Sequence, residues 1–199
     1  QGMQLEGVCE AMTSPSDSAH AVVVYSAKFP FIADLLRAPR ELGAAFAKAR
    51  FYKITPTWIR LIDNTRGFGH KEEIRLIRGI VRSGQSQGSP FTQLDWVRRQ
   101  FRDKLGFDPY PGTLNLHVQD RIALAAVRAQ PPIVIEPGQA GYCAAHVYRA
   151  RVNGQVTAAW IIPVVPDYAD DVVELMASVS LRGALNLKDG DSVEIEFGN

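Results

Sequence analysis

Cysteine is scarce in this chain, and the usual signals of a metal centre are missing. The 199 residues include two cysteines, Cys9 and Cys143, which lie far apart in the sequence. There is no Cys-x-x-Cys pair and no group of histidine and cysteine at zinc spacing, so no zinc site is predicted. We expect two buried thiols in a reducing cytoplasm, with a single disulfide as the alternative.

Charge of one sign and long apolar runs are also lacking. The formal net charge is +1, with 46% hydrophobic and 22% charged residues, which is ordinary for a globular protein. This balance gives no electrostatic reason to bind nucleic acid or an anionic membrane. No apolar run approaches the roughly 18 residues of a membrane span, and residues 1–7 have no signal-peptide character. We therefore expect a cytoplasmic protein with no nucleic-acid or membrane partner, and residues 1–7 are typical of a strand entered midway.

The chain also has no Gly-x-x-x-x-Gly-Lys-Ser/Thr segment, so a nucleotide is not expected to bind through a P-loop. The most informative segment present is residues 105–116, Leu-Gly-Phe-Asp-Pro-Tyr-Pro-Gly-Thr-Leu-Asn-Leu. Alternate side chains of a strand share a face, so Thr113 and Asn115 are predicted to point the same way. A hydroxyl and an amide oxygen suit a hard cation such as Mg²⁺ that already carries phosphates. Alone, however, Thr-x-Asn is common and mostly structural.

The pattern of expected helices and strands changes near residues 71–75, which predicts a short linker there between two units that pack together. In the first unit we expect a helix over residues 20–36 that Pro30 kinks or divides. The other elements expected there are a strand at 4–11, a helix at 39–48 and short strands at 51–56 and 58–63.

The second unit is rich in strands. An amphipathic helix is predicted over residues 94–105, after a glycine-rich loop at 83–90. Asn153-Gly154 predicts a hairpin between strands at 144–152 and 155–165. Further strands are expected at 76–82, 133–135, 172–177 and 192–197. Many strands with one clear helix indicate a mostly β fold with some α (α+β), built as a small barrel.

The second unit resembles the archaeal CTP-dependent riboflavin kinases, a family of cradle-loop β-barrels. The resemblance covers about residues 78–199. It rests on segments in matching order, namely 79–84, 105–116, 161–163, 172–177, 181–182 and 187–193. It implies a riboflavin-kinase-like barrel over residues 76–199. It also implies an Mg²⁺-dependent enzyme that transfers a phosphate from CTP to riboflavin and so makes FMN.

The same resemblance implies roles for individual residues. Thr113 and Asn115 correspond to the Mg²⁺ ligands. Pro166 and Glu174 fall at flavin-contacting positions, and Glu174 is the one carboxylate we consider as a catalytic base. Arg182 could neutralise a phosphate or pair with a carboxylate. The nucleotide-binding positions are Gly84, Gln85, Ser86, Gln87, Gly88, Ser89, Val179, Ser180, Leu181 and Arg182.

The chain departs from the family pattern at several of these positions. Ser86 stands where the glycine-rich loop has its middle glycine, Gln87 replaces a glutamate, and Ser89 replaces a basic residue. Pro166 replaces a threonine. A side chain at position 86 adds a Cβ where close backbone approach is needed. A non-catalytic flavin- or nucleotide-binding module therefore stays open as an alternative function.

The first unit resembles the C-terminal half of the pyridoxamine 5′-phosphate oxidase-like split barrels, which are dimeric flavoproteins. The matching segments are residues 29–31, 49–56 and 62–71. The resemblance implies a partial split-barrel segment with helices over residues 1–74, placed before the cradle-loop barrel. The unit is then either cut at its start or a degenerate barrel. It also implies a homodimer through this segment, and an FMN-dependent oxidoreductase as a further alternative function.

Overall fold

The computed structural model describes residues 1–32, 50–84 and 88–198. It divides into two compact units, one made of residues 1–5 and 57–199 and the other of residues 6–56. The helix expected at 39–48 lies outside the described residues. Within these described ranges, no helix has the length and apolar character needed to cross a bilayer.

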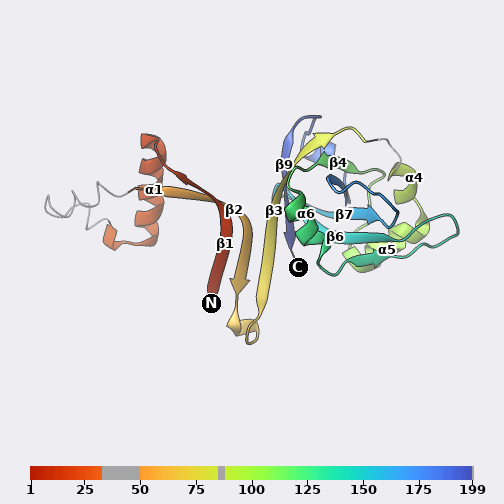
Figure 1. Cartoon of the computed structure of the whole chain (residues 1–199), viewed down its shortest axis with the longest axis horizontal. Coiled ribbons are helices and arrows are strands. Elements are labelled where there is room, and N and C mark those ends of the chain that lie inside the picture. Colours follow the sequence, from red (N-terminus) through yellow and green to blue (C-terminus); the bar gives the residue numbers. More distant parts are fainter. Residues whose placement is uncertain (33–49, 85–87, 199) are drawn as a thin grey trace. The chain divides into compact units, whose positions relative to one another are not determined.

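Six antiparallel strands close a barrel in the larger unit (Figure 1). In order around the barrel they are β3 (Lys71–Arg82), β4 (Leu114–His117), β8 (Val172–Ala177), β7 (Val156–Pro163), β6 (Ala145–Val152) and β9 (Ser192–Gly198). β9 pairs with both β6 and β3, and this double pairing closes the ring. The mostly β, α+β barrel predicted from the sequence is therefore confirmed.

Local turn chemistry explains the hairpin between β6 and β7. Asn153 and Gly154 have φ angles of 49° and 63°, the left-handed conformation that a two-residue type I′ turn requires. Val152 and Val156 are the first pair of the ladder, so the hairpin predicted around Asn153-Gly154 is present and its second strand begins one residue later than expected. The strands expected at 133–135 and 172–177 are also confirmed, as β5 (Ile133–Ile135) and β8.

β3 begins earlier than the sequence predicts, because its polar first half pairs with a neighbouring strand. Residues 71–75 were expected to form a short linker, yet they continue β3 and pair with β2 (Tyr52–Ile62). Glu73 accepts hydrogen bonds from Trp58 Nε1 at 3.1 Å and from Arg60 Nε at 2.7 Å across this ladder. Cross-strand charge pairing thus extends a strand that carries no alternating apolar pattern.

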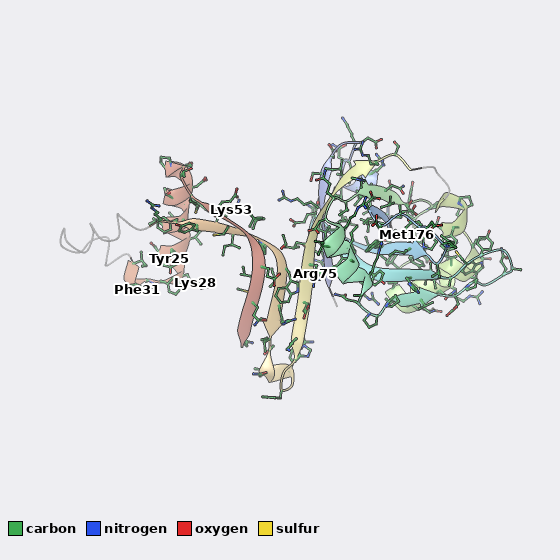
Figure 2. All side chains as sticks on the ribbon, viewed as in Figure 1. Tyr25, Lys28, Phe31, Lys53, Arg75 and Met176 are labelled. Atoms are coloured by element: carbon green, nitrogen blue, oxygen red, sulfur yellow. The ribbon has the colours of Figure 1, made fainter. Side chains whose placement is uncertain are left out.

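The barrel sheet has two faces with different partners. Val81, Leu116 and Val173 belong to the core inside the barrel. The opposite face of β5 to β8 packs against α5 (Asp95–Leu105), through helix residues Val97, Phe101 and Leu105. Met176, labelled in Figure 2, is fully buried in this second cluster. Since α5 covers only part of the outer face, the remainder is free to form a binding site.

A second helix of the barrel unit, α6 (Arg121–Arg128), was not predicted from the sequence. Asp120 caps it by accepting a hydrogen bond from Ala123 N at 2.9 Å, and Leu124 and Val127 are buried in the barrel core. The cap and the apolar spacing were readable signals, but the helix is short. The remaining helices here are η1 (Asn64–Arg66), α4 (Gly88–Thr92) and α7 (Leu181–Ala184).

In the smaller unit, α1 spans Pro15–Lys28 and carries Tyr25 and Lys28 (Figure 2). The helix expected from residue 20 begins five residues earlier, because a proline fits its first turn. It ends at Lys28, just before Pro30, which agrees with the predicted division there, and residues 33–36 of the expected helix lie outside the described residues. The two short strands expected at 51–63 are one strand, β2, beside β1 (Gly2–Ala11) in the sheet order. The split-barrel resemblance of residues 1–74 stays a prediction.

Both cysteines are free thiols, as expected, but both are exposed rather than buried. Cys9 lies in β1, whose residues are all exposed. Cys143 lies in the loop before β6. The expectation of burial failed because it rested on residue type alone.

Candidate functional site

A cavity of about 990 Å³ lies beside the barrel and takes residues from the five strands β3, β4, β6, β7 and β8 and from the loops around them. Its volume is at the upper end of the range of about 300–1,000 Å³ usual for small-molecule sites. Five residues predicted from the sequence line it, namely Gly84, Thr113, Asn115, Pro166 and Glu174. Segments that are far apart in the chain therefore meet at one place.

Strand register aligns three polar side chains on the cavity side of the sheet. Arg82 of β3 pairs with Asn115 of β4, and Asn115 pairs with Glu174 of β8. Glu174 in turn pairs with Ile161 of β7, which is also a lining residue. Directly opposed residues of a ladder point to the same face. The row lies opposite Val81, Leu116 and Val173, whose side chains fill the barrel.

Thr113 and Asn115 lie together, as strand alternation predicts. Asn115 Nδ2 donates to Thr113 Oγ1 at 3.3 Å. The turn before them is fixed from both sides, since Gly112 N donates to the Thr92 hydroxyl at 3.2 Å and Tyr110 N to the Ala177 carbonyl at 2.7 Å. The hydroxyl and the side-chain amide are therefore held in place at the start of β4.

Gly84 packs closely against this pair. A Cβ built on Gly84 would lie 2.1 Å from Asn115 Nδ2 and 2.8 Å from Asn115 Cγ, so no larger residue fits beside the amide in its present position. The absence of a side chain thus lets the backbone after β3 approach Asn115. Such bare backbone beside polar side chains is typical of phosphate-binding loops.

The donor set at this point fits a hard cation that brings its own anions. Thr113 and Asn115 offer neutral oxygens, and no group of three or more His, Cys, Asp or Glu suited to a metal occurs in the described parts of the chain. Mg²⁺ prefers oxygen ligands and is commonly held through few protein groups plus the phosphates of a substrate. The residues present therefore fit an Mg²⁺ ion that arrives with a nucleotide.

Glu174 is half-buried, and its environment perturbs its ionisation. Burial raises the pKa of its carboxyl above the ordinary value of 4.5, and the neighbouring Tyr168 hydroxyl partly offsets this by lowering it. Burial first, and then the charge of Glu174, raise the pKa of Tyr168. The Tyr168 hydroxyl is buried. In this cavity, the Glu174 carboxyl and the Tyr168 phenol therefore each affect the pKa of the other.

Sequence reasoning missed Tyr168 and the aromatic wall of the cavity. Phe91 and Tyr142 line it with ring centroids 6.4 Å apart, and Tyr142 also meets Trp96 edge-on at 5.7 Å. Tyr168 follows Asp167, whose φ of 56° turns the chain sharply after Pro166. No pattern in the sequence marks these rings, apart from the closeness of Tyr168 to Pro166.

The second predicted nucleotide segment, residues 179–182, does not line the cavity. Leu181 is buried in the barrel core, Val179 is exposed, and the Ser180 hydroxyl caps α7 by accepting from Gly183 N at 3.2 Å. Arg182 Nη2 lies 2.7 Å from Asp189 Oδ1 and donates to the Arg82 carbonyl at 2.8 Å.

Asp189 connects this segment to the start of the glycine-rich loop. The Ser83 hydroxyl donates to Asp189, and this bond first, then the one from Arg182, holds the pKa of the Asp189 carboxyl below its ordinary value. Of the predicted loop, Gln85, Ser86 and Gln87 lie outside the described residues, whereas Gly88 and Ser89 open α4. The structure therefore brings residues 83–84 and 182 together through one carboxylate.

The fold and the cavity define a β-barrel protein with a small-molecule site on the outer face of its sheet. Residues 81–197 match the family model of the CTP-dependent riboflavin kinases, also described as the domain of unknown function DUF120. This match covers more than half of the chain, so the chain belongs to the family of CTP-dependent riboflavin kinases.

Curated relatives carry the name riboflavin kinase. One from Archaeoglobus fulgidus is 38% identical over 125 residues, which are 60% of this chain and 53% of that protein. One from Pyrobaculum aerophilum is 41% identical over 129 residues, 62% of this chain and 60% of that protein. A relative from Methanothermobacter thermautotrophicus is 36% identical over 117 residues, 59% of this chain and 94% of that protein. The match to this chain thus spans about half of the Archaeoglobus protein but nearly all of the Methanothermobacter protein.

Proposed function

We propose that this protein transfers the terminal phosphate of CTP to riboflavin and so makes FMN, with Mg²⁺ as the metal. The observation that carries the proposal is the convergence of Gly84, Thr113, Asn115, Pro166 and Glu174 on one cavity. The resemblance of the sequence to the kinase family implies a role in binding nucleotide, metal or flavin for each of these positions. Family membership and the relatives named riboflavin kinase support the same reaction.

Thr113 and Asn115 would hold the Mg²⁺ ion through the hydroxyl and the amide oxygen. When bound, the ion neutralises phosphate charge and polarises the phosphorus–oxygen bonds. The role of the chain is to fix the ligands, and the bonds of Gly112 and Tyr110 to their neighbours do so. Phosphoryl transfer needs positioning and charge neutralisation more than covalent chemistry, which suits a site made of neutral ligands.

Glu174 would accept the proton of the attacking hydroxyl. The 5′-oxygen of riboflavin bonds to the terminal phosphorus, the bond from that phosphorus to the bridging oxygen breaks, and CDP leaves. The position of Glu174 opposite Asn115 supports this role, because the carboxylate and the metal ligand are direct neighbours across the ladder. A carboxyl whose pKa is raised by burial is also a better base near neutral pH.

The apolar wall suits a flat heteroaromatic ligand. Phe91 and Tyr142 present ring faces and edges, and Ile161, Pro163 and Met176 add aliphatic surface. Aromatic side chains gain from stacked or edge-on contacts beyond the area that they bury. The apolar side chains suit the flat ring system of a flavin. The polar side chains of Asn115 and Glu174 suit the flavin's own side chain, which must reach the phosphates.

A turnover assay tests the proposal. The purified protein is incubated with riboflavin, MgCl₂ and either CTP or ATP, and FMN is separated by chromatography. We expect FMN with CTP, and none when EDTA removes the metal. Absence of FMN with both nucleotides from a folded protein would reject the kinase activity. Calorimetric binding of CTP and riboflavin without turnover would instead favour the non-catalytic binding module that the altered loop leaves open.

A further inference from the structure

Arg82 is the last residue of β3 and the first of three consecutive residues that line the cavity, before Ser83 and Gly84. Its register with Asn115 puts its side chain on the cavity face of the sheet. It is the one arginine or lysine among the lining residues of the described part of the chain. A positive side chain therefore stands beside the pair of neutral metal ligands.

The guanidinium of Arg82 is uncommitted. Among the residues that the structure describes, it takes part in no hydrogen bond and no ion pair, and the side chain is exposed. Two other basic side chains near the site already have acidic partners. Arg182 pairs with Asp189 at 2.7 Å, and His117 Nε2 lies 3.3 Å from Asp171 Oδ2.

The backbone beneath Arg82 is firmly held, although its side chain has no partner. The Arg82 carbonyl accepts from Arg182 Nη2 at 2.8 Å. Val81 exchanges bonds with the turn before β9, donating to the Asp191 carbonyl at 2.8 Å and accepting from Gly190 N at 2.9 Å. A fixed backbone beneath a free guanidinium suits the binding of an anionic ligand, because little backbone freedom has to be lost on binding.

From these observations we infer that Arg82 binds the phosphate groups of the nucleotide, and this inference rests on the proposed function. A triphosphate carries several negative charges, and Thr113 and Asn115 are neutral. A positive side chain beside them would help the metal to offset the charge of the phosphates. Guanidinium forms paired hydrogen bonds with phosphate oxygens, which a point charge such as ammonium does not. In this chain Ser89 leaves the loop without its basic residue, and Arg82 supplies a positive charge from the neighbouring strand end.

Two matched variants test the role of Arg82. Arg82→Gln removes the charge at the cavity, whereas Arg78→Gln removes the charge of an exposed arginine on the same strand that does not line the cavity. Positions 78 and 82 point to the same face, because they lie an even number of residues apart in a strand. Thermal unfolding of both variants checks that the barrel is intact.

Calorimetry is run with three probes in the presence of MgCl₂, namely inorganic tripolyphosphate, CTP and riboflavin. Loss of one charge-assisted phosphate contact is expected to weaken tripolyphosphate and CTP binding by about tenfold or more in Arg82→Gln. Riboflavin binding should be unchanged, and Arg78→Gln should bind all three probes like the wild type. Arg82→Lys should recover only part of the loss, since ammonium lacks the planar fork.

The outcomes separate this inference from the function on which it rests. If the wild type binds CTP and Arg82→Gln binds it equally well, Arg82 has no phosphate role while the kinase proposal stands. If Arg78→Gln loses as much affinity for CTP and tripolyphosphate as Arg82→Gln, the loss reflects the overall charge of the protein rather than a contact at Arg82, and the inference is overturned. If the wild type binds neither tripolyphosphate nor CTP, both the inference and the proposed function are rejected.

Discussion

Replacing Gly84 with alanine should damage the site while leaving the barrel folded. The new Cβ would lie 2.1 Å from Asn115 Nδ2. An ordinary contact needs about 3.5 Å, so the amide must retreat by about 1.4 Å. Because the obstacle is the end of a side chain rather than backbone, Asn115 can turn away without disturbing the ladder.

The cost to folding and the cost to function then differ in size. Turning Asn115 away from its rotamer costs about 0.5–1.5 kcal/mol. Losing its bond to Thr113 costs a further ~0.5–1.5 kcal/mol, so the free energy of unfolding should fall by about 1–3 kcal/mol in total. A displacement of about 1 Å of a group that positions the reacting atoms can lower turnover by about 100-fold. Turnover should therefore fall far more than stability.

The assay measures FMN formation and chemical unfolding of the same preparations. Gly183→Ala is the matched control, because a Cβ there would meet Ser180 Oγ at 3.5 Å and Ser180 Cβ at 3.6 Å, both ordinary contacts. We expect the control to keep both properties. Wild-type turnover in Gly84→Ala would show that Asn115 need not occupy its present position, and would refute the role given to it in the metal site.

Three further predictions concern the metal ligand, the carboxyl and the packing of the outer face. Asn115→Ala should lower turnover by about 100-fold, whereas the free energy of unfolding should fall by only about 0.5–1.5 kcal/mol for the lost bond to Thr113, and rising MgCl₂ should restore part of the turnover if a ligand was lost. Turnover should rise with pH as Glu174 ionises, through an apparent pKa above 4.5, and Tyr168→Phe should move this limb to higher pH because the phenol lowers the pKa of Glu174; a limb that stays in place would contradict the pairing. Phe101→Ala removes a fully buried ring of α5 and should lower the free energy of unfolding by about 3–5 kcal/mol in denaturant, whereas a loss under 1 kcal/mol would show that α5 is not packed as described.

Parts of the site could be predicted because their cause is local. The alternation of a strand brings Thr113 and Asn115 together, and the Asn153-Gly154 turn sets the hairpin, so neighbouring residues were sufficient in both cases. Family resemblance then supplied Pro166 and Glu174. Glu174 meets Asn115 in the cavity because of the register of β4 with β8, and the periodicity of the sequence does not encode that register.

Other parts depend on distant partners and were beyond sequence reasoning. For Arg182 the sequence left two roles open, and the structure has the second, pairing with a carboxylate; that the partner is Asp189, and that the Arg82 carbonyl also accepts from its guanidinium, depends on how distant segments meet. Tyr168 is buried because of the turn at Asp167, and Arg82 faces the site because β3 meets β4 in one particular register. The early start of β3 likewise comes from Glu73 and its partners on β2, not from an apolar pattern.

A ligand-bound crystal structure tests the central claim most directly, namely that one cavity holds both the metal site and the flavin. Crystals of the protein are grown with CDP, MgCl₂ and riboflavin. We predict magnesium within bonding distance of the Thr113 and Asn115 oxygens, and the flavin against Glu174 in the cavity between the aromatic wall and β8. Magnesium or flavin bound elsewhere on the chain, with this cavity empty, would contradict the account.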